Sequence, residues 1–380
     1  MVKQKIREYI KTMMQRVLLP TVYSLSKKRT INKGLVILAD AHHDELPYSM
    51  RELAGQLREQ TDFTVMELCK DYQKGSYLSI ARSMLAFMRA YANAEFVVIC
   101  DNHLPVASCK KRPETKVIQL WHSGGALKRF GYDSPDNIPA SYHGGNVYAN
   151  YDLITVSADY AVTPFVRAMR TDRSHVQVLG ISRTDWYYNE EKKAEVRAHF
   201  AKEHPQAQGR KVILWAPTFR GSAADPKLAG AEEIEHLRST LSDEYYLIVK
   251  LHPHAQKAVK MPDSAMLTEE LLAVTDILIS DYSSVIYDYA YFGKPLILFT
   301  PDFEAYEKAC GFYEDYSSIP AYRAMDGTQL LEAVRACERW DAAAMQAFWE
   351  RTMHACDGHA TERIIRWMRT GHESNEGEDT

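Results

Sequence analysis

Leu35-Val36-Ile37-Leu38-Ala39-Asp40 is a short, unbroken apolar run that ends in a carboxylate. A continuous apolar pattern of this length is typical of a strand buried on both faces of a parallel sheet. Further runs of this kind follow at similar intervals, separated by helical stretches such as 77–94 and 158–169; they are 63–68, 96–100, 117–120 and 153–156. This alternation predicts an α/β fold, a parallel sheet with helices on both faces.

A second set of apolar runs begins at 176–179 and continues with 212–215, 246–251, 277–280 and 296–300. Helical patterns lie between them, near 189–203, 231–241, 283–292 and 303–309. Two consecutive doubly wound units fit a chain of 380 residues. We expect a basic segment over 1–34, an N-terminal Rossmann-like unit over 35–175, a C-terminal unit over 176–370 with closing helices, and a disordered acidic tail over 371–380.

The composition excludes several classes of protein. With 46% hydrophobic and 25% charged residues, the chain is neither collagen-like nor disordered throughout. The net charge of −4 argues against nucleic acid as the main partner. The six cysteines show no C-x-x-C pair, and we interpret them as reduced cytosolic thiols. Because no apolar run is long enough to span a bilayer and no signal sequence is evident, we expect an intracellular protein.

The first 34 residues depart from this charge balance, since they hold nine Lys or Arg and a single acidic residue, Glu8. Apolar side chains recur in this segment with helical spacing, and the basic ones lie largely off that stripe; the apolar residues are Ile6, Tyr9, Ile10, Met13, Val17 and Leu18. A basic amphipathic helix suits an anionic membrane surface. The alternative is a helix that docks on its own protein through the stripe.

In open parallel sheets ligands bind beyond the carboxyl ends of the strands, so the residues directly after each strand are the candidates for function. His122 follows the strand 117–120 and precedes Gly124 and Gly125, which allow a backbone to approach a ligand closely. An imidazole with an ordinary pKa of about 6.5 suits a general base, although a single histidine is more often structural. Lys128 is either a phosphate ligand or a solvated cation.

The strand 246–251 ends in Lys250-Leu251-His252-Pro253-His254. Proline stops the strand here. Two histidines suggest a metal, but no Cys or carboxylate lies at ligand spacing and the chain has no Asp-x-Asp triad. We therefore expect no metal, and a hydrogen bond from His252 to a phosphate.

Two hydroxyl-bearing turns follow other strands. Ser283 or Ser284, after Asp281, caps the next helix, whose free N–H groups and positive dipole end suit a phosphate; plain capping is the alternative. Thr218 and Arg220 follow the strand 212–215 and suit a phosphoryl oxygen, unless Arg220 simply pairs with an acidic neighbour.

Two further strand ends carry polar groups. The turn Gly180–Asp185 contains the cation Arg183. His42-His43-Asp44 resembles a set of metal ligands, but its spacing does not place the side chains on one helix face. We therefore expect it to have a supporting or acceptor-side role. Taken together, the strand ends hold histidines, arginines and a hydroxyl-capped helix. This set is suited to handling phosphate rather than to a hydrolytic triad.

Five of these motifs occur in this order in one known family: Trp121-His122 with Gly125-Ala-x-Lys-x-Phe-Gly131, Gly180-x-x-Arg183-x-Asp185, Ala216-Pro-Thr-Phe-Arg220, Leu251-His-Pro253 and Ser280-Asp-Tyr-Ser-Ser284. From about residue 35 to 350 the chain resembles the CDP-glycerol glycerophosphotransferases of wall teichoic acid synthesis. That resemblance implies a GT-B fold, two Rossmann-like domains around a cleft, with the donor mainly on the second domain. The first motif is one residue longer than in the polymerases and, like Ala39–Asp44 and the compact length, resembles the primase branch.

The resemblance also implies roles and substrates, with no cofactor. His122 removes a proton from the acceptor sugar hydroxyl, the oxygen attacks the glycerol-bearing phosphorus of CDP-glycerol, and CMP leaves. His252 binds or protonates the diphosphate. The other implied substrate-binding residues are Gly124, Gly125, Lys128, Arg183, Thr218, Arg220, Asp281, Ser283 and Ser284.

In the primase branch the acceptor is an undecaprenyl-diphosphate-linked disaccharide of N-acetylmannosamine and N-acetylglucosamine. We therefore expect a peripheral protein on the cytoplasmic face of the cell membrane, attached through residues 1–34. Several alternatives remain: transfer of ribitol phosphate, capsular polyol phosphate addition, chain polymerisation, and a non-catalytic membrane scaffold. A sugar transferase or UDP-sugar epimerase of the same fold would require a carboxylate pair, which the Ser280–Ser284 turn does not supply.

Overall fold

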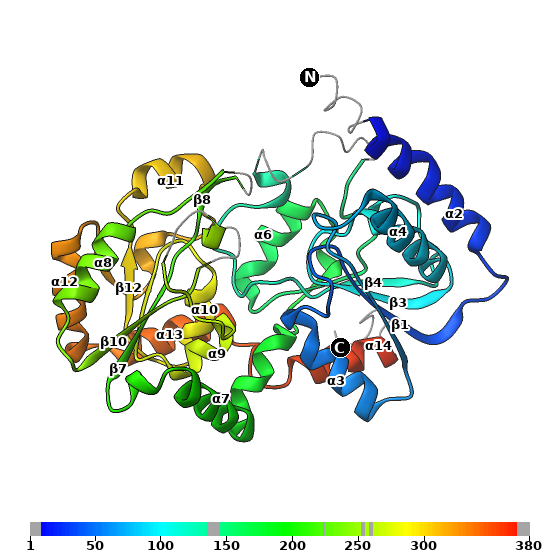
Figure 1. Cartoon of the computed structure of the whole chain (residues 1–380). Helices are drawn as coiled ribbons and strands as arrows, with labels where there is room; N and C mark the ends of the chain where they lie inside the picture. The colour runs from blue at the N-terminus through cyan, green and yellow to red at the C-terminus, as the bar shows by residue number, and fades with distance from the viewer. Residues whose placement is uncertain are drawn as a thin grey trace, which may run out of the picture. The chain divides into compact units, whose positions relative to one another are not determined.

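The structure is a computed structural model that describes residues 9–134, 138, 145–222, 225–251, 255–257 and 261–370. The chain divides into two compact units, each with its own parallel sheet (Figure 1). Unit 1 consists of residues 1–123, 130–185 and 355–380, and unit 2 consists of residues 124–129 and 186–354. The predicted fold class, α/β with two parallel sheets and an N-terminal helix, is confirmed.

The sheet of unit 1 has six parallel strands in the order β2-β1-β3-β4-β5-β6. They are β1 (Asn32–Asp40), β2 (Thr64–Cys69), β3 (Ala94–Ile99), β4 (Lys116–Gln119), β5 (Leu153–Thr155) and β6 (Val176–Gln177). β1 is central, and its Val36 pairs with Val65 of β2 and Phe96 of β3. Because helices cover both faces, residues 36–39 are buried without a break, which explains the unbroken apolar pattern.

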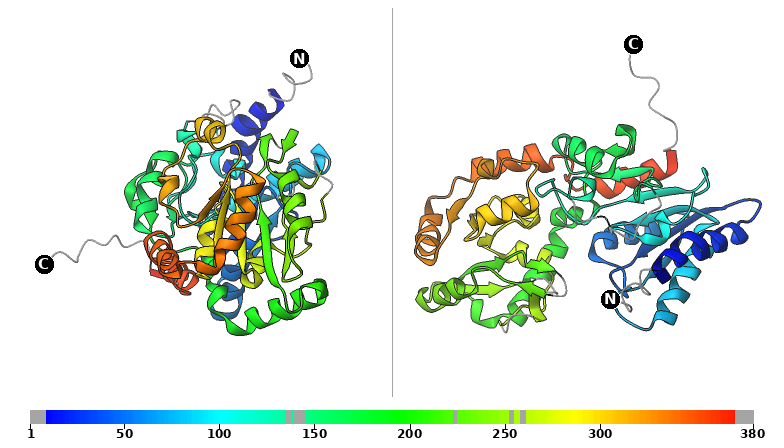
Figure 2. Two further views of the ribbon diagram at one scale, coloured as in Figure 1. Left: turned by 90° about the vertical axis from the view of Figure 1, so that its left-hand side faces the viewer. Right: turned by 90° about the horizontal axis from the view of Figure 1, so that it is seen from above.

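Helices cover the two faces of this sheet (Figures 1 and 2). α3 (Tyr48–Gln60) and the C-terminal α14 (Ala360–Thr370) pack on one face, and α4 (Tyr77–Tyr91) packs against β1 and β3. The short α5 (Leu104–Ala107), α6 (Asp159–Met169) and the 3-10 turns Gly131–Asp133 and Arg173–His175 complete the unit. The core formed with α3 and α14 contains Val36, Leu38, Leu53, Phe96, Val98, Ile118, Leu153 and Ile364.

The N-terminal helix runs over residues 9–26, with a π-helical turn at Met14–Leu18 followed by α2 (Leu19–Ser26). Leu19 and Tyr23 are buried, and α2 lies against α4. The predicted apolar stripe points the other way: its described members are 40–66% exposed, namely Tyr9, Ile10, Met13, Val17 and Leu18. The helix therefore docks on unit 1 through the face opposite the stripe.

Unit 2 holds five parallel strands in the order β10-β7-β11-β12-β13. They are β7 (Lys211–Ala216), β10 (Tyr245–Val249), β11 (Ile277–Ser280), β12 (Leu296–Phe299) and β13 (Tyr322–Ala324); β8 (Arg220–Ser222) and β9 (Asp225–Lys227) form a separate antiparallel pair. Its helices are α7 (Glu190–Glu203), α8 (Ala231–Thr240), α9 (Thr268–Val274), α10 (Val285–Ala290), α11 (Phe303–Cys310), α12 (Gly327–Ala336) and α13 (Ala342–Met353). One sheet face packs on α8 and α12 around Trp215, Ile279 and Phe299.

Two features differ from the sequence expectations. The run 176–179 does not open the second set of strands, because β6 pairs with β5 at Ile154 and Val176 and so completes the first sheet. α14 belongs to unit 1 rather than closing the second unit over 176–370, because Ile364 and Ile365 are buried against the first sheet. A two-residue strand and a terminal amphipathic helix carry no sequence signal of which sheet they will join. The predicted tail 371–380 lies outside the described residues.

Among the helices that the structure describes, none combines the length and apolar character required to cross a bilayer.

Candidate active site

His122 stands directly beyond the end of β4, at the carboxyl edge of the first sheet. The residue before it, Trp121, has a φ of 61°, in the left-handed region that costs a non-glycine residue about 1 kcal/mol or more. Phe130 and Phe165 pack around the Trp121 ring and hold it in place. The His122 ring stacks on Trp121 with 4.7 Å between ring centroids and stays 48% exposed. The turn therefore presents a supported but accessible imidazole.

The polar contacts of His122 orient its ring. Nδ1 lies 3.3 Å from the carbonyl oxygen of Cys100 and 3.8 Å from Oδ2 of Asp101. With its proton on Nδ1, the ring donates to that carbonyl, and Nε2 keeps a lone pair that can accept a proton. This is the arrangement of a general base held by its second nitrogen.

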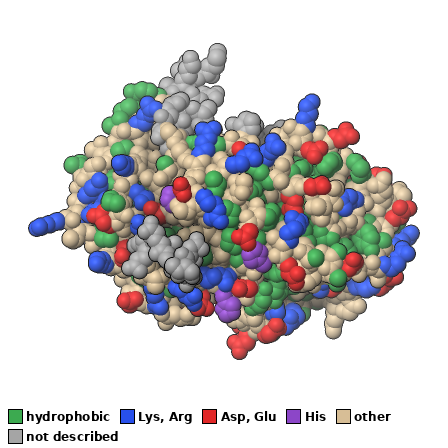
Figure 3. Space-filling view, turned by 180° about the vertical axis from the view of Figure 1, so that it is seen from behind, with side chains coloured by type: hydrophobic (Ala, Val, Ile, Leu, Met, Phe, Trp, Pro, Cys, Tyr) green, Lys and Arg blue, Asp and Glu red, His purple; other side chains and the backbone are tan. Residues whose placement is uncertain are grey.

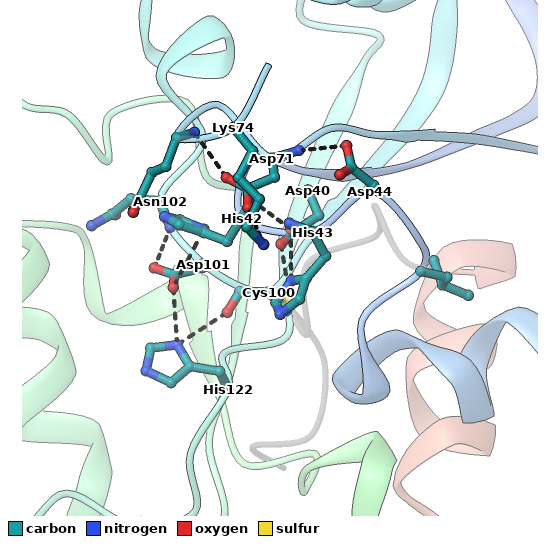
Figure 4. A network of polar contacts seen from close by, with 12 residues as sticks. Asp40, His42, His43, Asp44, Asp71, Lys74, Cys100, Asp101, Asn102 and His122 are labelled. Carbon is teal, nitrogen blue, oxygen red and sulfur yellow. Dashed lines mark hydrogen bonds and ion pairs between the residues drawn. The ribbon is translucent and has the colours of Figure 1, made fainter. Parts of the chain in front are cut away.

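Asp101 joins His122 to a second histidine (Figure 4). Its Oδ2 lies 3.7 Å from Nδ1 of His42, which follows β1, so the ends of β1, β3 and β4 meet around one carboxylate. Asp101 is not among the residues predicted from the sequence. Its place directly after the apolar run 96–100 was the signal that could have found it.

A second pair supports the first. The buried Asp40 accepts hydrogen bonds from the backbone N–H groups of His42 and His43, each 2.7 Å long, and lies 2.9 Å from Nδ1 of His43. Burial opposes ionisation of Asp40, but these hydrogen bonds hold its pKa below the ordinary value. The same contact raises the pKa of His43. Asp40 thus fixes the loop that carries His42 beside Asp101.

In unit 2, Arg220 is the centre of a different cluster. Its Nε and Nη2 contact the two carboxylate oxygens of Asp302 at 2.6 and 3.0 Å, and Nη1 lies 2.9 Å from Asp281. The guanidinium also lies 4.8 Å from the ring centroids of Tyr282 and Tyr306. Of the two roles considered for Arg220, the structure shows the pairing with acidic neighbours. Binding of phosphate by this residue stays a prediction.

Asp281 and Thr218 belong to the same cluster. The buried Asp281 accepts hydrogen bonds from the backbone N–H groups of Thr218 and Tyr282, at 2.8 and 2.6 Å. Thr218 also accepts a 2.6 Å bond from Arg220 through its carbonyl oxygen. These contacts tie the loop after β7 to the loop after β11, so the contacts of Asp281 are structural ones, within the protein.

Lys128 is half-buried in unit 2, where it forms an isolated antiparallel bridge with Phe312. Burial lowers the pKa of the Lys128 ammonium, Asp281 opposes that shift, and Arg220 adds to it. An ammonium that is partly desolvated gains from an anion brought beside it. Lys128 therefore has the electrostatics expected of a phosphate ligand.

Packing explains Gly124 and backbone conformation explains Gly125 in the first motif. A Cβ on Gly124 would lie 2.8 Å from Cε of Met353 and 3.3 Å from Cβ of Tyr287. Gly125 has a φ of 60°, in the left-handed region. The close approach predicted for this loop is therefore made to α10 and α13, and a contact of these glycines with substrate stays a prediction.

The serines before α10 differ from each other. Ser283 Oγ accepts a 3.3 Å bond from the N–H of Val285, which is the plain capping alternative. Ser284 occupies the N-cap position and makes no capping bond through its side chain. The helix itself is shorter than the 283–292 expected, ending at Ala290.

Of the remaining predicted residues, some lie in unit 1 and others lie outside the described residues. Arg183 is buried in unit 1, in the 3-10 segment Ser182–Tyr188. Asp185 of the same motif accepts hydrogen bonds from the N–H groups of Ala360 and Thr361 and so caps α14, which gives this part of the motif a folding role. His252, with Pro253 and His254, lies outside the described residues. Within the described residues, no group of three or more His, Cys, Asp or Glu is placed to hold a metal ion.

The chain consists of two Rossmann-like units, each built on its own parallel sheet, which is the organisation of a GT-B fold. Unit 1 carries an oriented imidazole at a strand end, and unit 2 carries basic and hydroxyl groups at its strand ends. A solved structure of the wall teichoic acid polymerase TagF soaked with CDPG has the same fold, with a TM-score of 0.76 at 19% identity over 97% of this chain and 98% of that one. This confirms the GT-B prediction.

The family follows from the sequence comparison. Residues 21–369 match the family described as CDP-Glycerol:Poly(glycerophosphate) glycerophosphotransferase, and the chain belongs to this family. The teichoic acid ribitol-phosphate primase of Bacillus spizizenii is 30% identical over 92% of this chain and 94% of its own length. The teichoic acid glycerol-phosphate primase of Bacillus subtilis is 30% identical over 72% of this chain and 73% of its own. The predicted membership of the CDP-glycerol glycerophosphotransferase family is therefore confirmed.

Proposed function

We propose that the protein is a primase that transfers one sn-glycerol 3-phosphate from CDP-glycerol to the N-acetylmannosamine of an undecaprenyl-diphosphate-linked disaccharide and releases CMP. The observation that supports this proposal is the position of the His122 imidazole, which is exposed beyond β4 and held through Nδ1 by the carbonyl of Cys100. Its Nε2 is the atom that takes the proton.

The reaction is a phosphoryl transfer, which depends on positioning and on charge stabilisation. The sugar hydroxyl gives its proton to His122 Nε2, and its oxygen forms a bond to the glycerol-bearing phosphorus. The bond from that phosphorus to the oxygen of CMP breaks, and CMP leaves with the electron pair. His252 binds or protonates the diphosphate. Lys128 and Ser284 supply charge and a hydrogen bond to phosphate oxygens, while Arg220 holds the loops that carry Thr218 and Asp281 in place.

Addition of a single unit, rather than polymerisation, is supported by the first motif. Trp121–Lys128 resembles the first motif of the primase branch. Gly124 in this motif packs on α10 and α13. Both of the relatives described above are primases by name.

A second candidate is transfer of ribitol phosphate. The relative that aligns with 92% of the chain is a ribitol-phosphate primase, at the same 30% identity as the glycerol-phosphate primase. The two candidates share the proposed base and the CMP leaving group, and they differ in the polyol of the donor.

Attachment to the membrane is supported by the N-terminal helix. Its apolar stripe is exposed, while Leu19 and Tyr23 on the opposite face hold the helix on unit 1. Such a stripe, flanked by Lys11 and Arg16, suits the interface of an anionic leaflet. The enzyme would thereby meet an acceptor whose lipid tail stays in the membrane, as a peripheral protein on the cytoplasmic face.

The test combines the purified chain with a short-chain lipid disaccharide and either CDP-glycerol or CDP-ribitol, and follows CMP release and product mass. A product heavier by one glycerol phosphate supports the proposal. A ladder of products would contradict the primase assignment, and turnover of CDP-ribitol alone would select the second candidate. A membrane scaffold without catalysis would release no CMP from either donor.

A further inference from the structure

Unit 1 contains a cavity of about 740 Å³ between residues 20–28, which are α2 and the residues after it, and the loop 108–114 that leads into β4. Five of its lining residues are cations and one is an acid; they are Lys27, Lys28, Lys110, Lys111, Arg112 and Glu114. The mechanism uses none of them. Figure 3 is turned by 180° from Figure 1, so the side with α2, at the upper right in Figure 1, is at the upper left in Figure 3. Hydrophobic side chains gather there, with Lys and Arg side chains near them.

Hydrogen bonds fix the two walls of this cavity to each other. The N–H of Arg112 donates to the hydroxyl of Tyr23 at 2.9 Å, and its Nη1 donates to the carbonyl of Lys28 at 3.0 Å. Asn93, which does not line the cavity, holds the same end of α2 on unit 1: it accepts a bond from the N–H of Lys28 and donates one to the carbonyl of Ser26, each 2.8 Å long. The cavity is therefore a formed part of unit 1, since the end of α2 and the loop cannot move apart without breaking these bonds.

The positive charge of the cavity is only partly neutralised. Lys111 pairs with Asp152 at 2.9 Å, and Arg112 lies 3.4 Å from Glu114. In the described part of the chain, Lys27, Lys28 and Lys110 form no ion pair with a carboxylate. Lys27 instead lies over the ring of Tyr23. Three positive charges around one hollow favour an anion in it.

The cavity lies beside the exposed apolar stripe of the helix. Pro20 and Ser24 line it, and they follow Val17 at spacings of three and seven residues, on one side of the helix. Leu25, next to Ser24, is 81% exposed. A ligand that fills the hollow and also covers this surface has an anionic head and an apolar body.

We propose that this cavity binds the phosphate headgroup of an anionic membrane phospholipid, whose acyl chains continue along the exposed stripe. The inference rests on the proposed membrane attachment and adds a defined headgroup site to it. It also extends the membrane-facing surface beyond residues 1–34, because the loop 108–114 belongs to the body of unit 1.

The experiment measures binding of the full chain to vesicles of pure phosphatidylcholine and to vesicles with 30% phosphatidylglycerol. The variant Lys28→Gln/Lys110→Gln removes two of the unpaired cations. Since each basic residue near an anionic surface contributes about 1 kcal/mol, we expect it to bind anionic vesicles about thirtyfold more weakly. The matched control Lys202→Gln/Lys308→Gln loses the same charge from exposed positions in unit 2 and should bind as the parent does.

Equal binding by both double variants would overturn the proposal. A titration with inorganic phosphate in the absence of vesicles distinguishes a lipid headgroup from a free phosphate. Phosphate binding that Lys28→Gln/Lys110→Gln abolishes, together with vesicle binding that the same variant leaves unchanged, would show that a free anion and not a lipid occupies the cavity. CMP release on a water-soluble acceptor should be unchanged in Lys28→Gln/Lys110→Gln. If the parent protein has no transferase activity but the variant still loses vesicle binding, the primase proposal fails and the lipid site stands.

Discussion

Oδ2 of Asp101 lies 3.8 Å from Nδ1 of His122, and the same oxygen lies 3.7 Å from Nδ1 of His42. One carboxylate thus faces two imidazoles that come from different strand ends. A carboxylate in this place would stabilise the imidazolium that forms if His122 takes a proton, as proposed. Asp101 is therefore a positioning residue for the proposed base.

Replacement of His122 by Ala should lower kcat by about 10²–10⁴-fold, which is the usual contribution of a general base. Thermal unfolding should change little, because the side chain is half-exposed. The measurement is CMP release at saturating CDP-glycerol. Turnover close to that of the parent protein would show that another group accepts the proton.

Asp101→Asn should lower kcat by about tenfold while KM for the donor stays nearly constant, because only the orientation and charge of the base change. His42→Gln serves as the comparison, since it removes the other partner of Asp101. If His42→Gln costs more than Asp101→Asn, then His42 rather than Asp101 has the greater part in the reaction.

Arg220→Lys should destabilise unit 2, because lysine cannot reproduce the bidentate contact with Asp302 and the contact with Asp281 together. Breaking a largely buried ion pair costs about 3–5 kcal/mol. Thermal or urea unfolding measures this loss. A variant with unchanged stability and weakened donor binding would instead assign Arg220 to the substrate.

Gly124→Ala should destabilise the protein by about 1–3 kcal/mol, as overpacking commonly does, because the new methyl group meets the end of Met353. The double variant Gly124→Ala/Met353→Ala provides the matched control. It should lose less stability than the sum of the two single variants, since the shorter side chain makes room for the methyl group. Strict additivity would contradict the packing explanation.

The hydrogen bond to Asp40 raises the pKa of His43. A raised pKa in the folded state means that this contact stabilises the fold fully below the ordinary value of about 6.5 and is lost as the pH rises through the folded value. An NMR titration should find His43 above its ordinary pKa, and Asp40→Asn should return it toward that value. An unchanged pKa of His43 in Asp40→Asn would show that the two side chains do not interact in solution.

The sequence predicted the order of the strands well because continuous apolar runs are strong signals. It placed β1, β7 and β11 correctly, since each is buried on both faces. The two-residue β6 and the terminal α14 were assigned to the wrong unit. The sequence pattern of a short strand or an amphipathic helix predicts that the element is buried, but it does not predict which sheet the element packs against.

The sequence predicted less of the candidate site than of the fold. The strand-end rule selected His122, Arg220 and Asp281, whose roles toward substrate stay predictions. It did not select Asp101, because a lone carboxylate has no motif of its own. Arg220, Gly124 and Gly125 are predicted to contact substrate. The structure shows that Arg220 and Gly124 make contacts within the protein, and the substrate contacts stay predictions. The spacing of motif residues cannot distinguish a ligand contact from a protein contact, because both require the same side chains at the same strand ends.

The backbone crosses between the two units four times, after residues 123, 129, 185 and 354. Neither unit is a single stretch of sequence, so no one cut yields either as an intact piece. A fragment ending at 185 would lack α14, and the sheet face that Ile364 and Met368 cover would meet water. A stop codon late in the gene would therefore destabilise unit 1, although the strands of this unit are synthesised first.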